Sequence, residues 1–359
     1  MRNKTLKPFK PGDRGIQWGI IGGGSVVEKN SISFNRIPQS NLQAIFRRDI
    51  AVATETAHRL GAKASYSSVT ELLADPDVNT VCIATPPGLH LEQAILCADA
   101  KKPTYIEKPL ARNYTEALRI VKAFEESGTP LFVGHYRRAL RRFQHLKEVL
   151  DDGIIGKAIE IDFRMCRQYP PDPKKEPQGW IYDPKFSGGG KFIDIAPHTI
   201  DLLIYLFGNF SSINSRAINS TITPRVEDVV VFTFNTDSGA VGTANFNMAS
   251  AEKSDQLIIS GTKGVIKLSV HGDEPIKISG EHSESEITDS IPNPIEEPMI
   301  ANVVYSLLGK ELPLCSGQDA LPTMKVIDEV LDEYYGGRSD DFWNRPASWS
   351  RRGAEKISN

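Results

Sequence analysis

Over the first 134 residues, short apolar runs alternate with segments whose apolar residues have helical spacing. The runs are too short and too uniformly apolar for half-exposed strands, which predicts strands buried on both faces. They are Gln17–Ile21, Leu42–Phe46, Thr80–Ala84, Thr104–Ile106 and Leu131–Val133. The helical segments between them are Val52–Leu60, Ser68–Ala74, Leu89–Ala100 and Thr115–Ser127. This alternation predicts an α/β fold with a parallel, doubly wound sheet and right-handed crossovers.

Beyond about residue 150 the pattern changes to β-rich runs separated by short turns, which predicts an antiparallel sheet. The runs are Ile159–Arg164, Val229–Phe234, Ala240–Phe246, Gln256–Ser260 and Val265–Ser269. Helical patterns cover Lys191–Phe207, ended by Gly208, and then Pro298–Leu308 and Ala320–Tyr335. Antiparallel strands with helices on one face make an α+β domain. We therefore predict a loose N-terminal extension over residues 1–14, a doubly wound domain over 15–134 and an α+β domain over 135–359.

Composition narrows the class of protein without naming a function. The 359 residues are 40% apolar and 24% charged, which excludes a disordered, collagen-like or coiled-coil chain. Forty-two bases against forty-five acids give a formal net charge of −3, so no global field favours nucleic acid or an anionic membrane. The longest apolar stretch, Leu202–Phe207, is far shorter than the roughly 20 residues that span a bilayer. Four scattered cysteines and a start without an apolar signal region predict a cytoplasmic protein with reduced thiols.

A glycine-rich turn follows the first predicted strand and opens a helix, as in dinucleotide-binding sites. Gly22 permits the tight turn, and Gly24 lets the main chain approach a pyrophosphate at the helix N-terminus, where Ser25 and Val26 follow. The third glycine of G-x-G-x-x-G is absent, because Val27 occupies its place. We expect the missing glycine to affect how the first helix packs more than whether the cofactor binds.

The end of the second predicted strand bears on the choice between NAD and NADP. An acidic residue there usually binds the ribose 2′-hydroxyl, whereas arginine accepts a 2′-phosphate. Here the strand runs into Arg47 and Arg48, followed by Asp49. Guanidinium groups can bind a phosphate through two hydrogen bonds, so we predict NADP in preference to NAD. The alternative is a pair of solvated arginines in a loop.

Two further segments carry candidate chemistry. Glu107-Lys108-Pro109 follows the fifth predicted strand, where ligands of open α/β sheets bind, and a lysine there can transfer a proton. Asp194 and His198 are four residues apart and would share a helix face after three glycines, although Pro197 requires the helix to start nearby or to bend. A buried histidine held by an aspartate, or a metal site that adds Asp201, are the alternatives for the second segment.

Together these motifs resemble the Gfo/Idh/MocA family of NAD(P)-dependent oxidoreductases over about residues 15–335. The resemblance rests on the glycine turn, on Ala84-Thr85-Pro86-Pro87 with His90, on Glu107-Lys108-Pro109, and on the triple glycine with Asp194 and His198, in this order. It implies an N-terminal Rossmann domain, a C-terminal domain with a large open antiparallel sheet that binds substrate and forms oligomers, and hydride transfer between nicotinamide and a sugar or polyol carbon.

The resemblance also implies roles for particular residues. Lys108 matches the catalytic lysine and His198 the catalytic histidine, with Asp194 supporting them or contacting substrate. Thr85, Pro86 and His90 match the loop beside the cofactor, which Glu107 would also border, and the Lys108–Pro109 bond is expected to be cis. Trp180 resembles a tryptophan near the substrate, although Ile181 stands where an arginine usually follows. We hypothesise that Lys108 carries the proton and that His198 orients the substrate hydroxyl.

Arginines cluster where the chain leaves the first predicted domain, at residues 137, 138, 141 and 142. A solvated basic face, interdomain ion pairs, nucleic-acid binding and a substrate anion are the alternatives, of which the net charge disfavours nucleic acid. Arg138 matches a position near the active site of relatives. Asn245, Phe246 and Met248 on the second sheet suggest an interface, so a homodimer or homotetramer is expected, with no membrane or metal partner.

The leading interpretation is an NADP-linked dehydrogenase or reductase of sugars, polyols or related diols. An NAD-dependent glycosidase on the same fold is an alternative, but such members usually alter the Glu-Lys-Pro motif, which is intact here. A non-catalytic nucleotide-sensing regulator is another, against which Lys108 and His198 both speak. The sequence gives neither the substrate nor the direction of the reaction.

Overall fold

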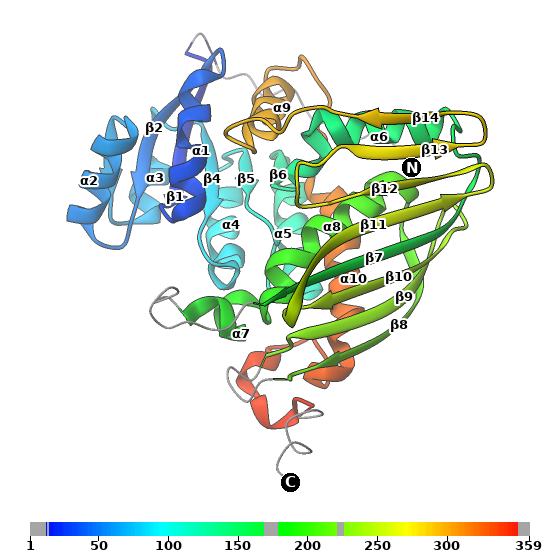
Figure 1. Cartoon of the computed structure of the whole chain (residues 1–359). Coiled ribbons are helices and arrows are strands. Elements are labelled where there is room, and N and C mark those ends of the chain that lie inside the picture. The colour runs from blue at the N-terminus through cyan, green and yellow to red at the C-terminus, as the bar shows by residue number, and fades with distance from the viewer. Residues whose placement is uncertain (1–11, 13, 169–178, 221–225, 351–359) are drawn as a thin grey trace. The chain divides into compact units, whose positions relative to one another are not determined.

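The computed structural model of the chain describes residues 12, 14–168, 179–220 and 226–350 (Figure 1). Contacts divide the chain into two units. The first comprises Met1–Ala111, Glu116–Ala139 and Pro292–Ala320, and the second comprises Arg112–Thr115, Leu140–Ile291 and Leu321–Asn359. These limits differ from a single boundary near residue 134, because a late segment returns to the first unit. The predicted extension over residues 1–14 lies, apart from residues 12 and 14, outside the described residues.

The first unit is built on a six-stranded sheet in the order β3-β2-β1-β4-β5-β6, with every neighbouring pair parallel. This confirms the predicted doubly wound sheet. The strands are β1 (Ile16–Gly22), β2 (Ser40–Phe46), β3 (Ala64–Tyr66), β4 (Thr80–Ala84), β5 (Thr104–Ile106) and β6 (Leu131–Val133). The sequence pattern did not indicate β3, whose three residues are all partly exposed and include no aliphatic run.

Helices follow the strands of the first unit as the crossover rule requires. They are α1 (Ser25–Arg36), α2 (Ile50–Leu60), α3 (Val69–Ala74), the short η1 (Pro87–Leu89), α4 (His90–Asp99) and α5 (Tyr114–Ser127), and the turn η2 (Tyr136–Ala139) follows β6. The returning helix α9 (Glu297–Leu307) packs on α1, where the Glu297 carboxylate accepts hydrogen bonds from Ser33 and Arg36. Side-chain bonds of this kind explain why residues 292–320 belong to the first unit.

The strand order reverses between β1 and β4, which makes this edge the topological switch point at which open α/β sheets bind ligands. The register pairs Gly22 at the end of β1 with Ala84 at the end of β4, and Ile83 in β4 with Ile106 at the end of β5. The segments that follow these three strands therefore start next to one another.

The second unit contains an eight-stranded sheet in the order β14-β13-β12-β11-β7-β10-β9-β8. All pairs are antiparallel except β10 with β7, so the predicted antiparallel sheet is present with one parallel pair at its centre. The strands are β7 (Ala158–Gln168), β8 (Phe210–Ile218), β9 (Val229–Thr236), β10 (Val241–Asn247), β11 (Ala249–Gly261), β12 (Gly264–Leu268), β13 (Ile276–Gly280) and β14 (Glu284–Ile287).

Three long helices, α6 (Arg141–Asp151), α8 (Lys191–Phe207) and α10 (Gly317–Tyr335), lie on one face of this sheet (Figure 1). Short turns accompany them: η3 (Gly179–Tyr182), α7 (Pro184–Ser187), η4 (Phe342–Asn344) and η5 (Pro346–Ser348). Alternate residues of β9 and β10 are buried on that face. Phe246 packs against Phe163 and Phe192 in this core. The expectation that Phe246 and Met248 mark an exposed interface is therefore wrong, because both are buried. An alternating pattern identifies two faces without saying which one is covered.

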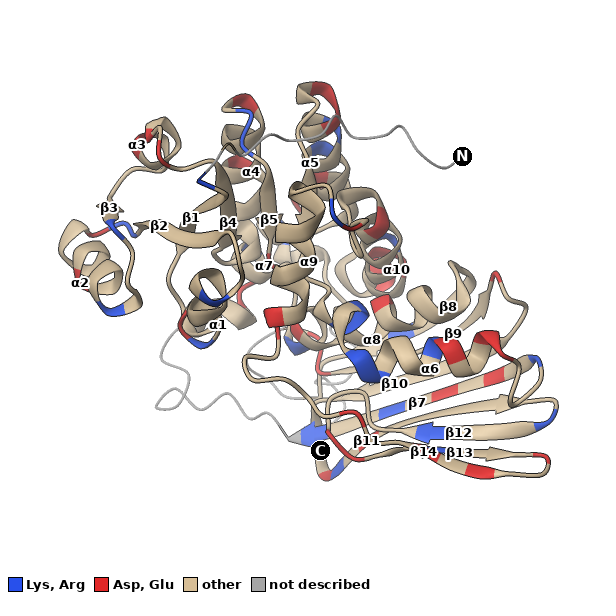
Figure 2. Ribbon diagram, turned by 90° about the horizontal axis from the view of Figure 1, so that it is seen from above, with Lys and Arg blue, Asp and Glu red and all other residues tan. Residues whose placement is uncertain are grey.

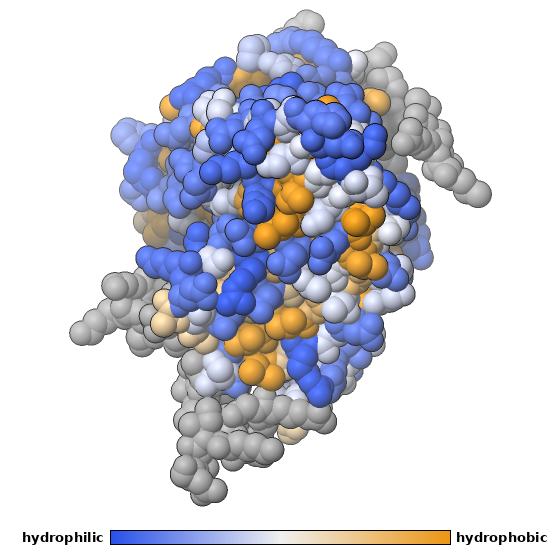
Figure 3. All heavy atoms as spheres, turned by 45° about the vertical axis from the view of Figure 1, so that its right-hand side comes forward, coloured by the Kyte–Doolittle hydropathy of each residue, from blue (hydrophilic) through white to orange (hydrophobic). Residues whose placement is uncertain are grey.

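The other face of the sheet carries exposed apolar side chains at Val231 and Val241. Seen with the right-hand side of Figure 1 brought forward, apolar side chains form separate patches among hydrophilic ones (Figure 3). Acidic and basic residues are interspersed along the helices of both units and along strands of the second unit (Figure 2), in line with the small net charge. Among the described residues, no helix is both long and apolar enough to span a membrane.

Candidate active site

The glycine turn leaves the N-terminus of α1 open. Gly22 has a φ of +123°, and a Cβ at this position would lie 2.6 Å from the Ala84 carbonyl oxygen, so a side chain does not fit. Gly24 caps α1 without a side-chain hydrogen bond, and nothing lies within 4 Å of a Cβ built there. Gly24, Ser25 and Val26 are exposed. The first amide groups of α1 thus face open space.

This arrangement fits the pyrophosphate of a dinucleotide, because unsatisfied amide groups and the positive end of the helix dipole attract an anion. The valine in place of the third glycine is accommodated: Val27 is 3% exposed and belongs to the core of the first unit. The valine that replaces the third glycine is therefore packed in the core beneath α1 and does not obstruct the open N-terminus of the helix.

Arg47 lies against the glycine turn. Its guanidinium donates a hydrogen bond to the Gly23 carbonyl oxygen, and a Cβ on Gly23 would collide with the Arg47 side chain. Arg48 is exposed beside it. The Asp49 carboxylate accepts hydrogen bonds from the amide groups of Ala51 and Val52 and so caps α2. The two cations thus follow β2 directly, while the nearest acid is engaged in a helix cap.

The loop after β4 is tied to the loop after β5 by a buried histidine. His90, which is fully buried, has Nε2 2.8 Å from the Thr85 carbonyl oxygen and Nδ1 3.1 Å from that of Pro109. Burial lowers the pKa of His90, with the carbonyl contacts acting in the opposite direction. Thr85 donates from its hydroxyl to the Gln93 side chain at 2.6 Å. His90 therefore shapes the predicted cofactor loop from inside and does not line it.

Lys108 stands two residues beyond the end of β5, at the same edge of the sheet as the glycine turn. Its side chain is partly exposed. The peptide bond between Lys108 and Pro109 is cis, as the resemblance led us to expect. The structure thus brings Gly22, Thr85 and Lys108 to adjacent strand ends within one unit.

Glu107, next to Lys108, points into the first unit. It is 8% exposed, and its carboxyl group is hydrogen-bonded to that of Glu296, at the N-terminus of α9, which is 7% exposed. Burial raises the pKa of both groups, and the proximity of Glu107 raises that of Glu296 further. Gly134 makes room, because a Cβ there would lie 3.2 Å from the Glu107 Oε2. Glu296 is not predictable from the sequence, because it is 189 residues away from Glu107 with no motif around it.

In the second unit, α8 presents the other predicted acid–base residues. The helix covers the predicted range, Lys191–Phe207, and runs through Pro197. Fourteen of its seventeen residues are buried, and the three that are not are Asp194, His198 and Tyr205. With spacings of four and seven residues, these side chains share one face. The single partly exposed stripe of α8 thus begins with the two predicted residues.

A second histidine lies beside His198. The ring centroids of His198 and His271 are 5.9 Å apart at an angle of 79°, and the His271 Nε2 is 3.3 Å from the Thr199 hydroxyl. Asp255 holds the main chain there by accepting from the His271 amide at 2.7 Å. His271 limits how the His198 ring can turn. His271 is not predictable from the sequence, because an isolated histidine after a strand belongs to no motif.

Two domain models match this arrangement. One, described as an oxidoreductase family with an NAD-binding Rossmann fold, matches residues 16–135, and a GFO/IDH/MocA C-terminal domain matches residues 143–267. An oxidoreductase of Formosa agariphila is 33% identical over 317 residues, covering 87% of this chain and 97% of the relative. The chain belongs to the Gfo/Idh/MocA family. It is accordingly an oxidoreductase with an NAD-binding fold.

A second relative and a solved structure are also similar to this chain. Myo-inositol 2-dehydrogenase of Thermotoga maritima is 30% identical over 257 residues, covering 69% of this chain and 73% of the relative. A levoglucosan dehydrogenase solved with NADH and levoglucosan superposes with a TM-score of 0.79 at 23% identity, covering 89% of this chain and 96% of that one. The latter likeness supports the fold.

The arginine cluster of this Gfo/Idh/MocA member is not a solvated face. Arg137, Arg138 and Arg142 are buried, and only Arg141 of the four is exposed. Arg138 donates to the carbonyl oxygens of Leu314 and Asp319, both at 3.3 Å, so its guanidinium is engaged inside the first unit. Residues 136–139 form a 3₁₀ turn and α6 begins at Arg141, which separates the residues that one helix would have aligned.

The remaining predicted groups are placed as follows. Trp180 lies in η3, partly exposed. Asp201 is buried and accepts a hydrogen bond from Thr323 of α10, so it is not part of the Asp194–His198 stripe. In the described part of the chain, no group of three or more His, Cys, Asp or Glu residues could hold a metal ion. The four cysteines are free and buried.

The Glu107–Glu296 pair leads to a prediction about stability. A carboxyl group whose pKa is raised on folding stabilises the fold below its unfolded pKa of about 4.3, and this contribution is lost as the pH rises through the raised value. Glu296→Gln keeps a donor for Glu107 and cannot ionise. We expect its Tm to exceed that of the wild type by several degrees at about pH 8 and by little at about pH 4.5.

Thermal unfolding followed by circular dichroism at the two pH values checks this. Glu297→Gln is the matched control, since Glu297 is bonded to Ser33 and Arg36 and its loss is expected to lower Tm slightly without a gain at high pH. A Glu296→Gln variant that is less stable than wild type at both pH values would contradict the assignment of the pair.

Proposed function

We propose that this chain transfers a hydride between NADP(H) and the hydroxyl- or carbonyl-bearing carbon of a sugar, a polyol or a related diol. One observation carries the proposal: the open N-terminus of α1 and Lys108 follow β1 and β5, which flank β4, at the same edge of one sheet. Main chain suited to an anion and a side chain that can move a proton thus share one sheet edge, and oxidation of a C–OH group by a dinucleotide needs both.

The cofactor is assigned to the first unit. Gly22, Gly24, Ser25 and Val26 would bind the pyrophosphate through the amide groups at the start of α1. The Thr85–Pro86 loop, held from inside by His90, and the Glu107–Lys108 segment would border the rest of the molecule. A bound nicotinamide supplies the two-electron chemistry by accepting a hydride from the substrate carbon or donating one to it.

Lys108 is assigned the proton transfer. In oxidation its amine takes the proton of the substrate hydroxyl as the C–H bond breaks, and in reduction its ammonium group returns that proton to the carbonyl oxygen. His198 is assigned the orientation of the same hydroxyl, with Asp194 supporting it from the preceding turn of α8. Trp180 is a further candidate for substrate contact. Arg138 is left out, because its guanidinium is engaged with main-chain carbonyls.

The preference for NADP is supported by Arg47 and Arg48. Both follow β2 directly, where the ribose of a dinucleotide lies in this fold. Asp49, the residue that could instead bind a 2′-hydroxyl, caps α2 with its carboxylate. Two cationic side chains, together with an aspartate whose carboxylate is engaged in capping α2, favour binding of a phosphate at the end of β2.

We further infer a cytoplasmic homodimer or homotetramer. Four buried free thiols support a reducing compartment, and the apolar side chains on the uncovered face of the eight-stranded sheet support self-association.

The near-ultraviolet absorbance of reduced nicotinamide tests the proposed reaction. The purified chain is incubated with NADP or NAD and a panel of sugars, polyols and diols, and with NADPH or NADH and their keto forms. We expect a substrate-dependent change in absorbance, larger with the phosphorylated cofactor. Tight NADPH binding without turnover anywhere on the panel would refute catalysis, and glycoside cleavage without net change in NADPH would refute the proposed reaction type.

A further inference from the structure

A turn of three glycines precedes α8 and is pressed between two other segments of the second unit. A Cβ on Gly188 would lie 2.6 Å from the Arg112 carbonyl oxygen, and one on Gly190 would lie 2.5 Å from that of Glu227. At Gly189 a Cβ would meet the Glu227 Oε1 at 3.0 Å and the Ile193 side chain. Glycine is therefore needed at Gly188 and Gly190, where a Cβ would collide with main chain of a neighbouring segment, and the turn is packed tightly on both sides.

Arg338 holds the first end of this turn. Its guanidinium donates to the Gly188 carbonyl oxygen at 2.8 Å and to that of Arg112 at 2.7 Å, and its Nε donates to Asp328 at 2.8 Å. The residue is 1% exposed, and the guanidinium lies over the rings of Tyr335 and Phe342. Because the guanidinium of Arg338 is planar and bonded to three acceptors at once, it restricts the position of the Gly188 carbonyl group.

Glu227 holds the other end. Its Oε1 accepts from the Gly190 amide at 2.8 Å, and its Oε2 accepts from the Tyr335 hydroxyl. The carboxyl group is buried, which raises its pKa, while the bonds from Tyr335 and Gly190 act in the opposite direction. Both ends of the glycine turn are thus held by contacts with the end of α10, at Tyr335, and with Arg338 in the segment just after it.

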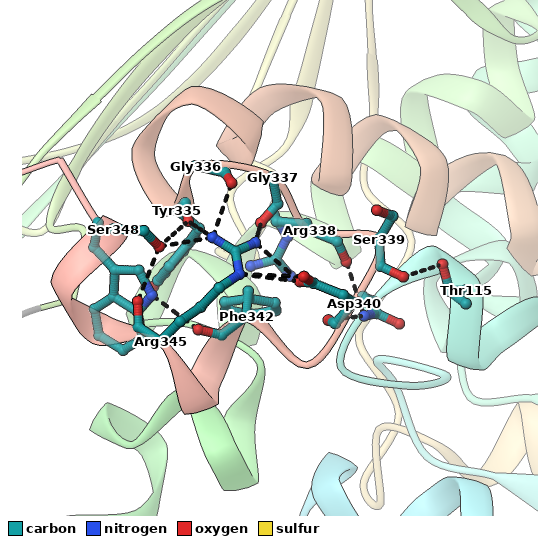
Figure 4. A network of polar contacts seen from close by, with 12 residues as sticks. Thr115, Tyr335, Gly336, Gly337, Arg338, Ser339, Asp340, Phe342, Arg345 and Ser348 are labelled. Carbon is teal, nitrogen blue, oxygen red and sulfur yellow. Dashed lines mark hydrogen bonds and ion pairs between the residues drawn. The ribbon is translucent and has the colours of Figure 1, made fainter.

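The segment just after α10 is held by hydrogen bonds of its own. The Arg345 guanidinium donates to the carbonyl oxygens of Tyr335, Gly336 and Gly337 and pairs with Asp340 (Figure 4). Gly336 and Gly337 have φ values of +65° and +97°, so the chain turns sharply enough for one arginine to reach all three carbonyls. The Asn113 side chain also donates hydrogen bonds to the main-chain carbonyl oxygens of Arg338 and Asp340 in this segment.

The first turn of α8 depends on these external bonds more than the first turn of an ordinary helix does. Pro197 has no amide hydrogen, so the Ile193 carbonyl oxygen lacks its usual donor four residues on. Gly190 supplies no side-chain cap. Two of the bonds that normally hold a first turn are therefore missing, and Asp194 lies in that turn.

We propose that Arg338 is a positioning residue, which with Glu227 and Tyr335 fixes the glycine turn and so sets the place of Asp194 and His198. This assignment deepens the proposed function and rests on it for its effect on turnover. We call Arg338, Glu227 and Tyr335 the clamp. The clamp acts through the start of α8 and requires no contact of Arg338 with substrate or cofactor.

The test compares Arg338→Gln, Arg338→Lys and Tyr335→Phe with the control Arg216→Gln, which breaks an exposed ion pair with Glu333 on α10. We expect Arg338→Gln to lower kcat/KM for the substrate by about 10–100-fold, as a misplacement of about 1 Å does, with cofactor Kd unchanged. Arg338→Lys should recover part of the loss, Tyr335→Phe should lose less, and Arg216→Gln should match the wild type.

Amide hydrogen exchange supplies the readout that is independent of turnover. Exchange in Arg338→Gln should become faster over residues 188–198 and stay unchanged in the first unit. Normal exchange and turnover in a folded Arg338→Gln would overturn the proposal. Faster exchange throughout the chain in both Arg338→Gln and Tyr335→Phe would also overturn it, because the role would then be general stability. If the wild type converts no substrate, the proposed function fails. The hydrogen exchange over residues 188–198 still shows whether Arg338 fixes the glycine turn.

Discussion

Replacing Lys108 by methionine is expected to lower kcat by about 10²–10⁴-fold, the range of an acid–base group, while NADP(H) still binds. Methionine has a similar length and fills similar space but can neither accept nor return a proton. Cofactor binding is expected to survive, because the glycine turn and the start of α1 do not depend on the lysine side chain. Steady-state kinetics and fluorescence titration of NADPH measure the two effects separately.

Lys122→Met is the matched control for this change. Lys122 is an exposed residue of α5 whose ion pair with Glu126 is four residues away on the same helix, and its loss should leave both kcat and Kd as they are. Turnover of Lys108→Met close to that of the wild type would remove Lys108 from the proton transfer. Equal losses of kcat and NADPH affinity would assign it to binding instead.

The second large effect concerns cofactor choice. The double variant Arg47→Asp with Arg48→Ala is expected to lower the ratio of kcat/KM for NADP to that for NAD by about 10–100-fold, since a charge-assisted hydrogen bond contributes about 1.5–3 kcal/mol. The new aspartate repels a 2′-phosphate and can accept from a 2′-hydroxyl. The ratio is obtained from initial rates with each cofactor at a fixed substrate concentration.

Arg119→Ala controls for a general change of charge, because Arg119 is exposed on α5, away from the end of β2. It should leave the ratio unchanged. An unaltered ratio in the double variant would mean that Arg47 and Arg48 are solvated loop residues, and the bond from Arg47 to Gly23 would then serve the turn alone.

Three of the six strands of the parallel sheet could be predicted to the residue. β4, β5 and β6 coincide with the predicted ranges, because strands buried on both faces are short, continuous apolar runs with polar boundaries. The strands β3, β8, β13 and β14 carried no such signal. Their residues are exposed or only partly buried for much of their length, and tertiary pairing determines that they are strands.

The candidate site could be predicted where its residues stand in local motifs. The glycine turn, Lys108 and the Asp194–His198 pair are of this kind, and the structure places the first two on one sheet edge. Glu296, Glu227, His271 and Arg338 were missed because each depends on a partner far away in the chain. The arginines near residue 138 were misjudged for the same reason: main-chain carbonyls of residues 314 and 319 accept from the buried Arg138, and those of residues 272 and 274 accept from the buried Arg142.

Transfer of an isotopic label tests the central claim most directly. NADPH that carries deuterium at its transferable position is incubated with the chain and a keto substrate found on the panel, and the product is analysed by mass spectrometry. Direct hydride transfer predicts one deuterium on the newly formed carbinol carbon, with none lost to solvent. A product with hydrogen from solvent at that carbon, or with no net reduction, would contradict the proposed reaction.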